Sequence, residues 1–465
     1  MAIYSYVPFS DAKQELANRL YDSSMVFWTS TELGKYIHEA LHTFNALTGY
    51  WRGDFTFTPQ PNITWYDITQ LPNSLRPYTL FDTNIYLDIQ YALLEPAVGV
   101  NPWTGVSKQF TADDIINAVQ RRRDELLSIA SCTITRRLVP AVAGRTFLPD
   151  TVIDVRRICY LPAGSLAGYG SGAYGMGLYG VSIPSPQQPT VVWPEDTWGE
   201  QSFRRNYTLN PAGIPSTYLM STQPPISFDT NRPPAYSGQY ELLTTEAGAA
   251  LSPATPTTLS VPDDWAHLIK WGALADLLSR DSNAQDLPRA AYCEQRYHMG
   301  IEILAKAPAL LAMQMNNVPM EIDSVRAADL YNTSWEAQPP APPTAAYHAG
   351  LNMLALAPVP DGGTYSALIT VVQNAPVPIA ATDPVQVSRD DYDVMLDYAQ
   401  HLASFKMGGQ EFLGTLPLLK RFLQQAAGYG LKLAELGEYT SALYELSQRE
   451  NHMNPVAAPA PVEAD

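Results

Sequence analysis

The sequence is poor in cysteine, in lysine and in long apolar runs, and each shortage argues against a class of protein. Its three cysteines, Cys132, Cys159 and Cys293, are widely spaced and odd in number. They predict buried free thiols, not a disulfide framework or a cysteine-based zinc site. No stretch approaches the ~18 apolar residues that a membrane-spanning helix needs. Residues 1–10 lack a basic segment followed by an apolar run, so we expect no secretory signal and a protein made and kept in a reducing cytoplasm.

Positive charge is scarce as well. The chain has 29 Lys and Arg against 46 Asp and Glu, a formal net charge of -17. A surface that coats nucleic acid needs clustered cations to displace counterions from phosphates, so the balance argues against non-specific coating. The exception is residues 121–205, which hold ten Arg and no Lys against seven acidic residues. The doublets Arg156-Arg157 and Arg204-Arg205 in that segment are candidates for contact with an acidic partner surface.

Apolar and aromatic residues are plentiful. A chain of 465 residues with 46% hydrophobic content predicts two to four structural units with real cores. It has 27 Tyr, 9 Trp and far more Arg than Lys, and these are the types that anchor protein interfaces. Two interpretations stay open at this point: a protein that works through interfaces, or the compositional bias of a GC-rich genome.

Residue periodicity predicts an α+β fold. Four N-terminal segments have helical periodicity: residues 11–22, 30–50, 80–94 and 111–129. Between them, residues 55–58 and 64–68 alternate apolar and polar side chains and predict a short hairpin. From residue 133 the pattern changes to strands separated by Pro and Gly. We therefore expect a helical N-terminal part followed by a β-rich middle.

A β-rich stretch leading into a helix pair is written twice, at residues 214–306 and 345–434. At an offset of about 127 residues, five apolar positions of the first helix recur: Trp265, Leu268, Ile269, Ala275 and Leu278 fall on Tyr392, Met395, Leu396, Leu402 and Phe405. The second helices of the two pairs share no clear register. The pattern predicts an internal duplication, although amphipathic helix pairs also look alike through patterning alone.

Composition shifts predict the domain boundaries. In chain order we expect a helical region at 1–130, a β-rich region at 131–213 with an inserted Gly/Tyr-rich loop at 163–190, a first β-plus-helix-pair unit at 214–337, a Pro-rich connector at 338–344, a second such unit at 345–450 and a flexible tail at 451–465. In the inserted loop, Tyr169, Tyr174 and Tyr179 are candidates for a contact with a neighbouring subunit, the alternative being a flexible linker.

His38-Glu39-Ala40-Leu41-His42 is the one catalytic pattern in the chain. Two His four residues apart on a helix can hold zinc while the Glu activates a water. No His follows until His267, so the third ligand expected after such a motif is missing. The two rings also lie off the apolar stripe, as a solvated or subunit-facing side would. We expect no catalytic residue, no metal and no cofactor, and we interpret Asp263-Asp264 and Asp390-Asp391 as helix caps.

Two parts of the chain resemble one family. Thr31 to Trp51, and the helix pair from Val261 to Leu278 and Arg289 to Tyr297, are similar to virion proteins of tailed bacteriophages of the neck or head-to-tail connector type. The resemblance implies a homo-oligomeric ring, commonly of twelve subunits, that sits below the portal protein and joins the DNA-filled capsid to tail or further neck proteins. It implies DNA passage without sequence-specific binding, no membrane contact and a C-terminal tail that docks into the portal.

The expected function is therefore structural and non-enzymatic, with the protein located in the virion at the junction of neck and tail. One alternative is another virion part, such as a tail tube, baseplate or fibre-attachment protein. An alternative of a different class is a zinc metallohydrolase that uses His38, Glu39 and His42. The family's minimal connectors are far shorter than this chain, so the unit after residue 344 has no counterpart in them.

Overall fold

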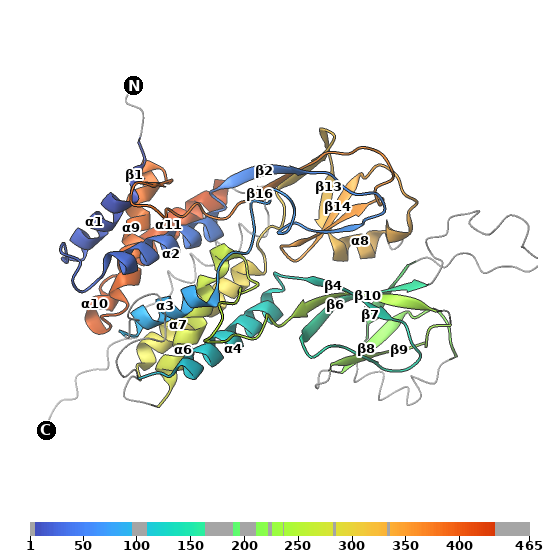
Figure 1. The fold of residues 1–465 in the computed structure, drawn as a ribbon, viewed down its shortest axis with the longest axis horizontal. Coiled ribbons are helices and arrows are strands. Elements are labelled where there is room, and N and C mark those ends of the chain that lie inside the picture. Colours follow the sequence, from blue (N-terminus) through green and yellow to red (C-terminus); the bar gives the residue numbers. More distant parts are fainter. Residues whose placement is uncertain are drawn as a thin grey trace, which may run out of the picture.

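A computed structural model describes residues 5–94, 109–162, 189–195, 211–221, 226–235, 237–281, 285–332 and 335–432. The helices gather at one end of the molecule, and two β-lobes project side by side from the other end (Figure 1). Most strands pair antiparallel, and helices and sheets occupy separate regions of the molecule. The predicted α+β class is confirmed.

Four helices form the N-terminal half of the bundle: α1 (Phe9–Arg19), α2 (Ser30–Thr48), α3 (Asp82–Ala92) and α4 (Ala112–Ala130). All four were predicted from periodicity, with ends within a few residues. The side chain of Thr29 accepts a hydrogen bond from the backbone amide of Glu32 at the start of α2. Thr111 forms a capping box with Asp114 at the start of α4.

The C-terminal half of the bundle consists of the helices α6 (His267–Ser279), α7 (Leu287–Leu304), α9 (Arg389–Ser404), α10 (Gly409–Leu413) and α11 (Leu416–Lys432). A short 3-10 turn, η2 (Asp263–Trp265), precedes α6. One core of buried apolar residues runs through the N-terminal and C-terminal helices together. The bundle is therefore a single packed body.

One β-lobe is a seven-stranded sheet in the order β4-β10-β6-β7-β8-β9-β5. Its strands are β4 (Thr135–Pro140), β5 (Thr146–Phe147), β6 (Val152–Pro162), β7 (Thr190–Pro194), β8 (Thr217–Ser221), β9 (Ser227–Thr230) and β10 (Gly238–Glu246). β10 is central because it pairs antiparallel with both β4 and β6. The lobe has an apolar cluster of its own.

The other β-lobe holds two four-stranded sheets, β12-β11-β16-β2 and β13-β14-β15-β3. Its elements are β2 (Arg52–Phe57), β3 (Trp65–Asp67), β11 (Ala312–Met315), β12 (Val318–Pro319), β13 (Glu321–Ser324), α8 (Val325–Tyr331), the turn η3 (Trp335–Ala337), β14 (Ala345–Ala349), β15 (Met353–Ala357) and β16 (Ala367–Val372). A two-residue pair, β1 (Val7–Pro8) with β17 (Pro384–Val385), joins the N-terminal end of the chain to the segment that precedes α9.

The predicted hairpin at residues 55–68 is wrong. β2 pairs with β16 and β3 pairs with β15, so each strand finds its partner near the far end of the chain. Phe55 and Phe57 are buried where β2 meets Ile369 and Ala367 of β16. Alternation of apolar and polar side chains determines which face of a strand is buried, but it does not specify the neighbouring strand. The hairpin prediction for β2 and β3 depended only on the short connection between them.

These pairings divide the chain differently from the predicted domains at 1–130, 214–337 and 345–450. Residues 7–68 and 312–432 form one unit, which we call the split unit, and residues 82–304 form a second unit placed between its two parts, the inserted unit. The Pro-rich segment is no free connector. The backbone amides of Ala341 and Thr344 donate to carbonyls of the split unit's own β-lobe at 3.1 and 2.9 Å.

The two units share one arrangement of helices. In each, a short helix and a long helix precede the β-lobe, and a helix pair follows it: α1, α2, α9 and α11 in the split unit, α3, α4, α6 and α7 in the inserted unit. Both short helices have 11 residues and both long helices have 19. In each unit the long helix packs on the first helix of the following pair. A common origin of the two units stays a prediction.

Candidate functional site

The three polar side chains of the His38–His42 motif point to three different partners. His38 Nε2 lies 2.8 Å from the carbonyl oxygen of Pro378, and its ring stacks on that of Phe9 with centroids 5.2 Å apart. Glu39 is buried and forms an ion pair with Lys270 of α6, which is buried as well. Each side chain of the motif thus belongs to a contact between α2 and another segment of the bundle.

His42 completes this set of contacts. Its Nδ1 lies 2.7 Å from Oδ1 of Asp264, and Asn45, one turn further along α2, donates to Oδ2 of the same carboxylate at 2.6 Å. Among the residues that the structure describes, no group of three or more His, Cys, Asp or Glu is placed to hold a metal ion. Since Glu39 is neutralised by Lys270, it is not poised to activate a water between the two histidines.

Asp263 and Asp264 are not helix caps, contrary to the prediction. The cap position before η2 is Pro262, and no side chain caps it. Asp263 instead accepts hydrogen bonds from the backbone of Thr79 and Leu80 at 2.8 and 3.1 Å, and so ties the segment before α3 to the start of α6. Asp390 and Asp391, the counterparts of Asp263 and Asp264, lie in the first turn of α9. The cap itself is Ser388, whose hydroxyl donates to Asp391, so the prediction holds only in part.

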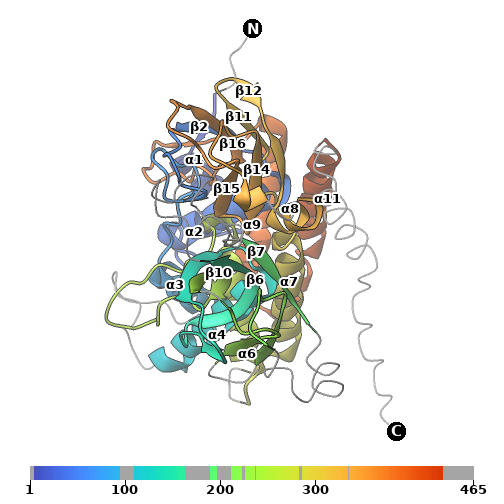
Figure 2. The same ribbon diagram turned by 90° about the vertical axis from the view of Figure 1, so that its right-hand side faces the viewer.

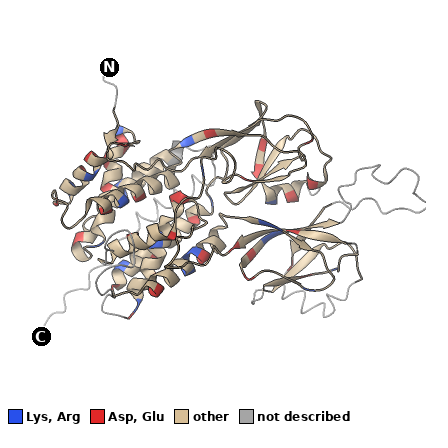
Figure 3. Ribbon diagram, in the orientation of Figure 1, with Lys and Arg blue, Asp and Glu red and all other residues tan. Residues whose placement is uncertain are grey.

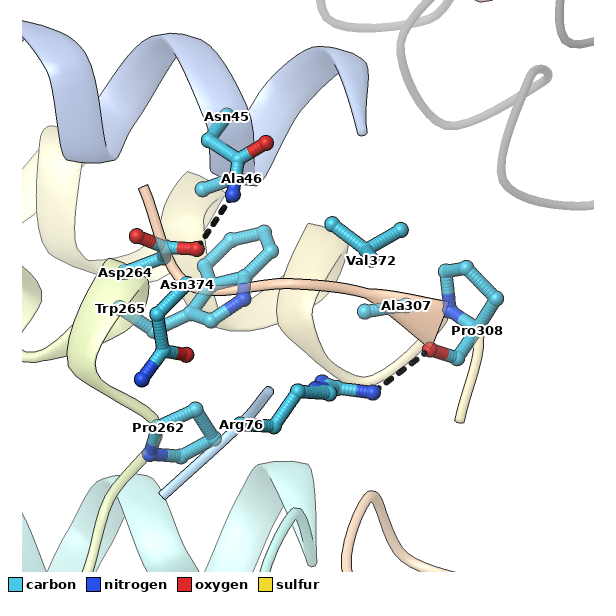
Figure 4. Close-up of a pocket in the computed structure, with 10 residues that line it drawn as sticks. All are labelled: Asn45, Ala46, Arg76, Pro262, Asp264, Trp265, Ala307, Pro308, Val372 and Asn374. Atoms are coloured by element: carbon cyan, nitrogen blue, oxygen red, sulfur yellow. Dashed lines mark hydrogen bonds between the residues drawn. The ribbon is translucent and has the colours of Figure 1, made fainter. Parts of the chain in front are cut away.

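The two aspartates form the centre of a polar junction where both units meet, and Figure 4 shows Asp264 with its hydrogen bond to Asn45. Asp264 also accepts from the backbone of Ala375 at 3.1 Å, and Asn374 donates to Asp263 at 3.3 Å, so the segment after β16 is held on the same pair. On the other side of the junction Arg76 donates to the carbonyl of Ala309 at 2.9 Å. The cavity between them measures about 20 Å³, which is room for about one water molecule and no substrate.

Three histidines that are wholly or mostly buried, His38, His267 and His401, make the bundle sensitive to acid. Burial lowers the pKa of His38 to about 4 and that of His401 to about 3, and it holds the pKa of His267 well below its ordinary value. The His401 ring lies 2.7 Å from the Tyr292 hydroxyl and 2.8 Å from the Thr415 hydroxyl, contacts that a neutral ring satisfies as one donor and one acceptor.

We therefore expect the free energy of unfolding to fall as the pH drops from about 6.5 toward 4. The unfolded chain takes up protons on these rings at about pH 6.5 while the folded chain does not, and each such ring adds a slope of about 1.4 kcal/mol per pH unit. Urea titrations at several pH values measure this slope. His401→Gln should make it shallower by about one proton, whereas an unchanged slope would show that His401 does not contribute.

Arg157, predicted as an interface residue, is buried between the two β-lobes. Its guanidinium makes two bonds to Asp329 of α8, at 2.7 and 2.9 Å, and one to Glu336 of η3 at 3.0 Å. Glu241 of β10 lies 3.3 Å away and is also held by Arg136 at 2.6 Å. Since α8 and η3 belong to the split unit and β6 to the inserted unit, this ion cluster joins the lobes. Figure 3 shows the mixture of basic and acidic segments around β4 and β6.

The carboxylates of the cluster divide their charge unequally. Burial and the nearby charge of Glu336 raise the pKa of Glu241 to about 7. Burial alone would raise the pKa of Glu336, but the attraction of Arg157 and the hydrogen bonds from Arg157 and Cys159 together lower it. Such perturbed groups often mark active sites, but here each carboxylate is bonded to an arginine. Cys159 donates to Glu336 at 3.2 Å, and burial raises the pKa of its thiol, so it is unreactive.

A cleft of about 790 Å³ lies beside the ion cluster, between the lobes and the end of α7. Its lining includes Val192, Tyr218, Arg156 and His348. Arg156, the exposed neighbour of Arg157, is 40% exposed, and it bonds to Asp154 at 3.0 Å and to the carbonyl oxygen of Ser128 at 2.5 Å, so its contact with a partner stays a prediction. The other interface candidates, Tyr169, Tyr174, Tyr179, Arg204 and Arg205, and the tail at 451–465, lie outside the described residues.

The chain matches no protein-family model and no curated protein. Within the described part of the chain, no helix has both the length and the apolar character needed to cross a bilayer. The sequence pattern indicates the reactive side chains of the His38–His42 motif but not their partners. The recurrence of Asp263-Asp264 in Asp390-Asp391 was the one sequence signal near the polar junction. No signal in the sequence predicts that Glu39 pairs with Lys270.

Proposed function

We propose that the chain is a structural protein of a tailed-bacteriophage particle, a ring-forming neck or head-to-tail connector that links the portal protein to the tail and lets DNA pass. One observation carries the proposal. The two stretches that resemble connector proteins, residues 31–51 and 261–297, are far apart in the sequence yet pack together, with His42 and Asn45 bonded to Asp264.

The use of polar groups supports a structural role. Glu39, His42 and Asp264 would be the natural candidates for hydrolytic chemistry, and each is occupied by a contact that holds one unit on the other. A structural protein of a virion needs such fixed geometry more than it needs reactive groups. The net charge of -17 suits a channel for DNA, because an acidic wall repels phosphates and prevents adhesion without reading sequence.

The test is assembly with the portal protein of the same particle. We expect the purified chain, alone or mixed with its portal, to form rings in negative-stain images, and labelled chains to lie at the neck of intact particles. A protein that stays monomeric and never binds the portal would contradict the proposal. Stoichiometric zinc that is lost in His42→Ala would instead support the hydrolase alternative.

A further inference from the structure

The two β-lobes are bonded to each other where they leave the helical bundle. Just after α4, the backbone amide of Ile134 donates to the Asn352 side chain at 2.8 Å, and that side chain donates back to the Ile134 carbonyl at 3.0 Å. The backbone amide of Leu351 donates to the carbonyl of Cys132 at 2.7 Å. In Figures 1 and 2 the split unit's lobe, with β14, lies above the inserted unit's lobe, with β6 and β10. These bonds attach the lobes to each other at the end next to the bundle.

Farther along the strands, the lobes meet through charged side chains. The inserted unit contributes Arg136 of β4, Arg157 of β6 and Glu241 of β10, and the split unit contributes Asp329 of α8 and Glu336 of η3. The side chains of the three carboxylates are 3%, 4% and 10% exposed for Glu241, Asp329 and Glu336. Three buried carboxylates therefore face two guanidinium groups, which leaves one negative charge unbalanced when every group of the cluster is ionised.

The unbalanced charge falls on Glu241 and Glu336. Arg157 makes two bonds to Asp329 but one to Glu336, at 3.0 Å, and its contact with Glu241 is the longest, at 3.3 Å. A hydrogen bond between the carboxyl groups of Glu336 and Glu241 is among the causes that lower the pKa of Glu336. Such a bond needs a proton on one of the two groups, because an ionised carboxylate only accepts. Burial and the charge of Glu336 raise the pKa of Glu241 to about 7, so Glu241 carries the proton.

The other groups around Glu241 keep their charge near neutral pH. Arg136 and Arg157 stay protonated. Burial raises the pKa of the Cys159 thiol of β6, which donates to Glu336 and stays neutral. On the split unit's side, Asp329 is held by Arg157 and by the indole of Trp335 at 2.9 Å. Tyr347 of β14, which packs on Trp335, has a raised pKa and stays neutral as well.

We propose that Glu241 and Glu336 form a proton-dependent latch: the proton between them holds the outer parts of the two lobes together, and its loss lets the lobes separate. With the proton, Glu241 donates to Glu336 while Arg136 donates to its Oε2. Without it, two buried negative charges lie in contact, one on each lobe, and repel each other across the interface. The bonds between Ile134 and Asn352 remain, so the lobes open from the end farther from the bundle.

Separation of the lobes widens the cleft of about 790 Å³ beside the latch, because Arg157 and Asp329 of the same cluster line that cleft. The latch is a property of the single chain. It therefore goes beyond the proposed ring-forming function, and it can be tested without a portal protein.

The direction of the pH dependence follows from the raised pKa of Glu241. In open lobes the side chain is solvated and regains the ordinary pKa of 4.5, whereas in closed lobes the pKa is about 7. Between these values the closed lobes hold a proton that the open lobes have lost. The closed form is therefore favoured most below about pH 4.5 and loses this advantage as the pH rises to about 7. From pH 5.5 to 8 the equilibrium constant for opening should rise on the order of tenfold.

The native thiols report the opening in the full chain. Cys159 is buried at the closed interface, where it donates to Glu336, and Cys293 is buried in the bundle. Alkylation by iodoacetamide, followed for each cysteine by mass spectrometry, measures how often each thiol becomes accessible. Dividing each rate by that of the same cysteine in urea-unfolded protein at the same pH removes the pH dependence of the thiolate. Opening of the lobes accelerates Cys159 alone, whereas unfolding of the bundle accelerates Cys293 too.

Glu241→Gln tests the assignment, because its amide can donate to Glu336 at every pH. The corrected rate of Cys159 should rise on the order of tenfold between pH 5.5 and 8 in the wild type and stay low in Glu241→Gln. Glu246→Gln is the matched control: Glu246 lies on the same strand and pairs with Arg137 inside the inserted unit's lobe, so this variant should behave like the wild type. Equal pH dependence in Glu241→Gln and the wild type would overturn the latch.

A distance measurement keeps the test decisive if Glu241→Gln does not fold. Arg326 of α8 and Ser221 of β8 line the cleft on opposite lobes. Spin labels on Arg326→Cys and Ser221→Cys, attached at pH 5.5 where the native cysteines are covered, report the separation of the lobes by double electron–electron resonance. The distances should shift to longer values at pH 8. The same distance distribution at both pH values would show that the lobes do not open and that the proposed latch is wrong.

Discussion

Replacing Arg157 with methionine is expected to lower the free energy of unfolding by about 3–5 kcal/mol, as is typical when one partner of a buried ion cluster is removed. The guanidinium is the bonding partner of Asp329, Glu336 and Glu241, and its side chain is only 6% exposed. Without it, these carboxylates stay buried with too few positive charges. Urea unfolding followed by circular dichroism measures the loss.

The adjacent arginine provides a matched control. Arg156 lies on the same strand with its side chain 40% exposed, so Arg156→Met should change the free energy of unfolding by less than about 0.5 kcal/mol. Because the cluster joins the two lobes, Arg157→Met should also make the lobes more accessible to protease than the helical bundle. Equal effects of the two substitutions would contradict the role assigned to Arg157.

Lys270→Met should cost a similar amount, about 3–5 kcal/mol, by leaving Glu39 charged in the apolar bundle. The Lys270 side chain is 4% exposed and that of Glu39 is 6% exposed, and burial already raises the pKa of Glu39. The substitution removes the cation that favours the ionised carboxylate, so the pKa rises further. The deficit relative to wild type should be largest above the raised pKa that Glu39 has in the variant, and it should disappear as the pH falls toward the ordinary pKa of a glutamate and Glu39 takes up a proton.

Two variants test this explanation. Glu39→Leu combined with Lys270→Met should recover most of the lost stability, because an apolar pair of similar size replaces the ion pair without leaving a charge buried. Lys306→Met, at an exposed position just after α7, should have almost no effect. A double variant as unstable as Lys270→Met alone would show that the loss comes from packing and not from the unpaired Glu39.

The helices were predictable because their signals are local. Thr111 and Asp114, which lie within one turn of each other, form the capping box of α4. The offset of 127 between Trp265 and Tyr392 marks positions that are buried in both helices. The register of the second helices was missed. Three buried residues of α7 and three of α11 have the same spacing: Ala290, Cys293 and Tyr297, and Leu419, Phe422 and Ala426. Because the paired side chains differ in size, the common register is not evident in the sequence.

Partners distant in the sequence were not predictable. Nothing near Trp65 indicates that β3 pairs with β15, and nothing near Arg157 indicates that Asp329 and Glu336 will surround it. An arginine doublet on a strand points its side chains to opposite faces, so one of the two was bound to face inward. The sequence does not indicate which side of the strand becomes the interior. For this reason the arginine doublet predicts a surface position for Arg157, although its side chain is buried.

By itself the sequence determined the α+β class and the helices, since both depend on residues within a few turns of one another, and it carries the recurrence of Asp263-Asp264 in Asp390-Asp391. Only the tertiary structure decided that residues 7–68 and 312–432 form one unit around residues 82–304, and that the His38–His42 side chains serve as contacts. Those outcomes depend on which surfaces meet, and burial and charge pairing exist only after the chain has brought distant residues together.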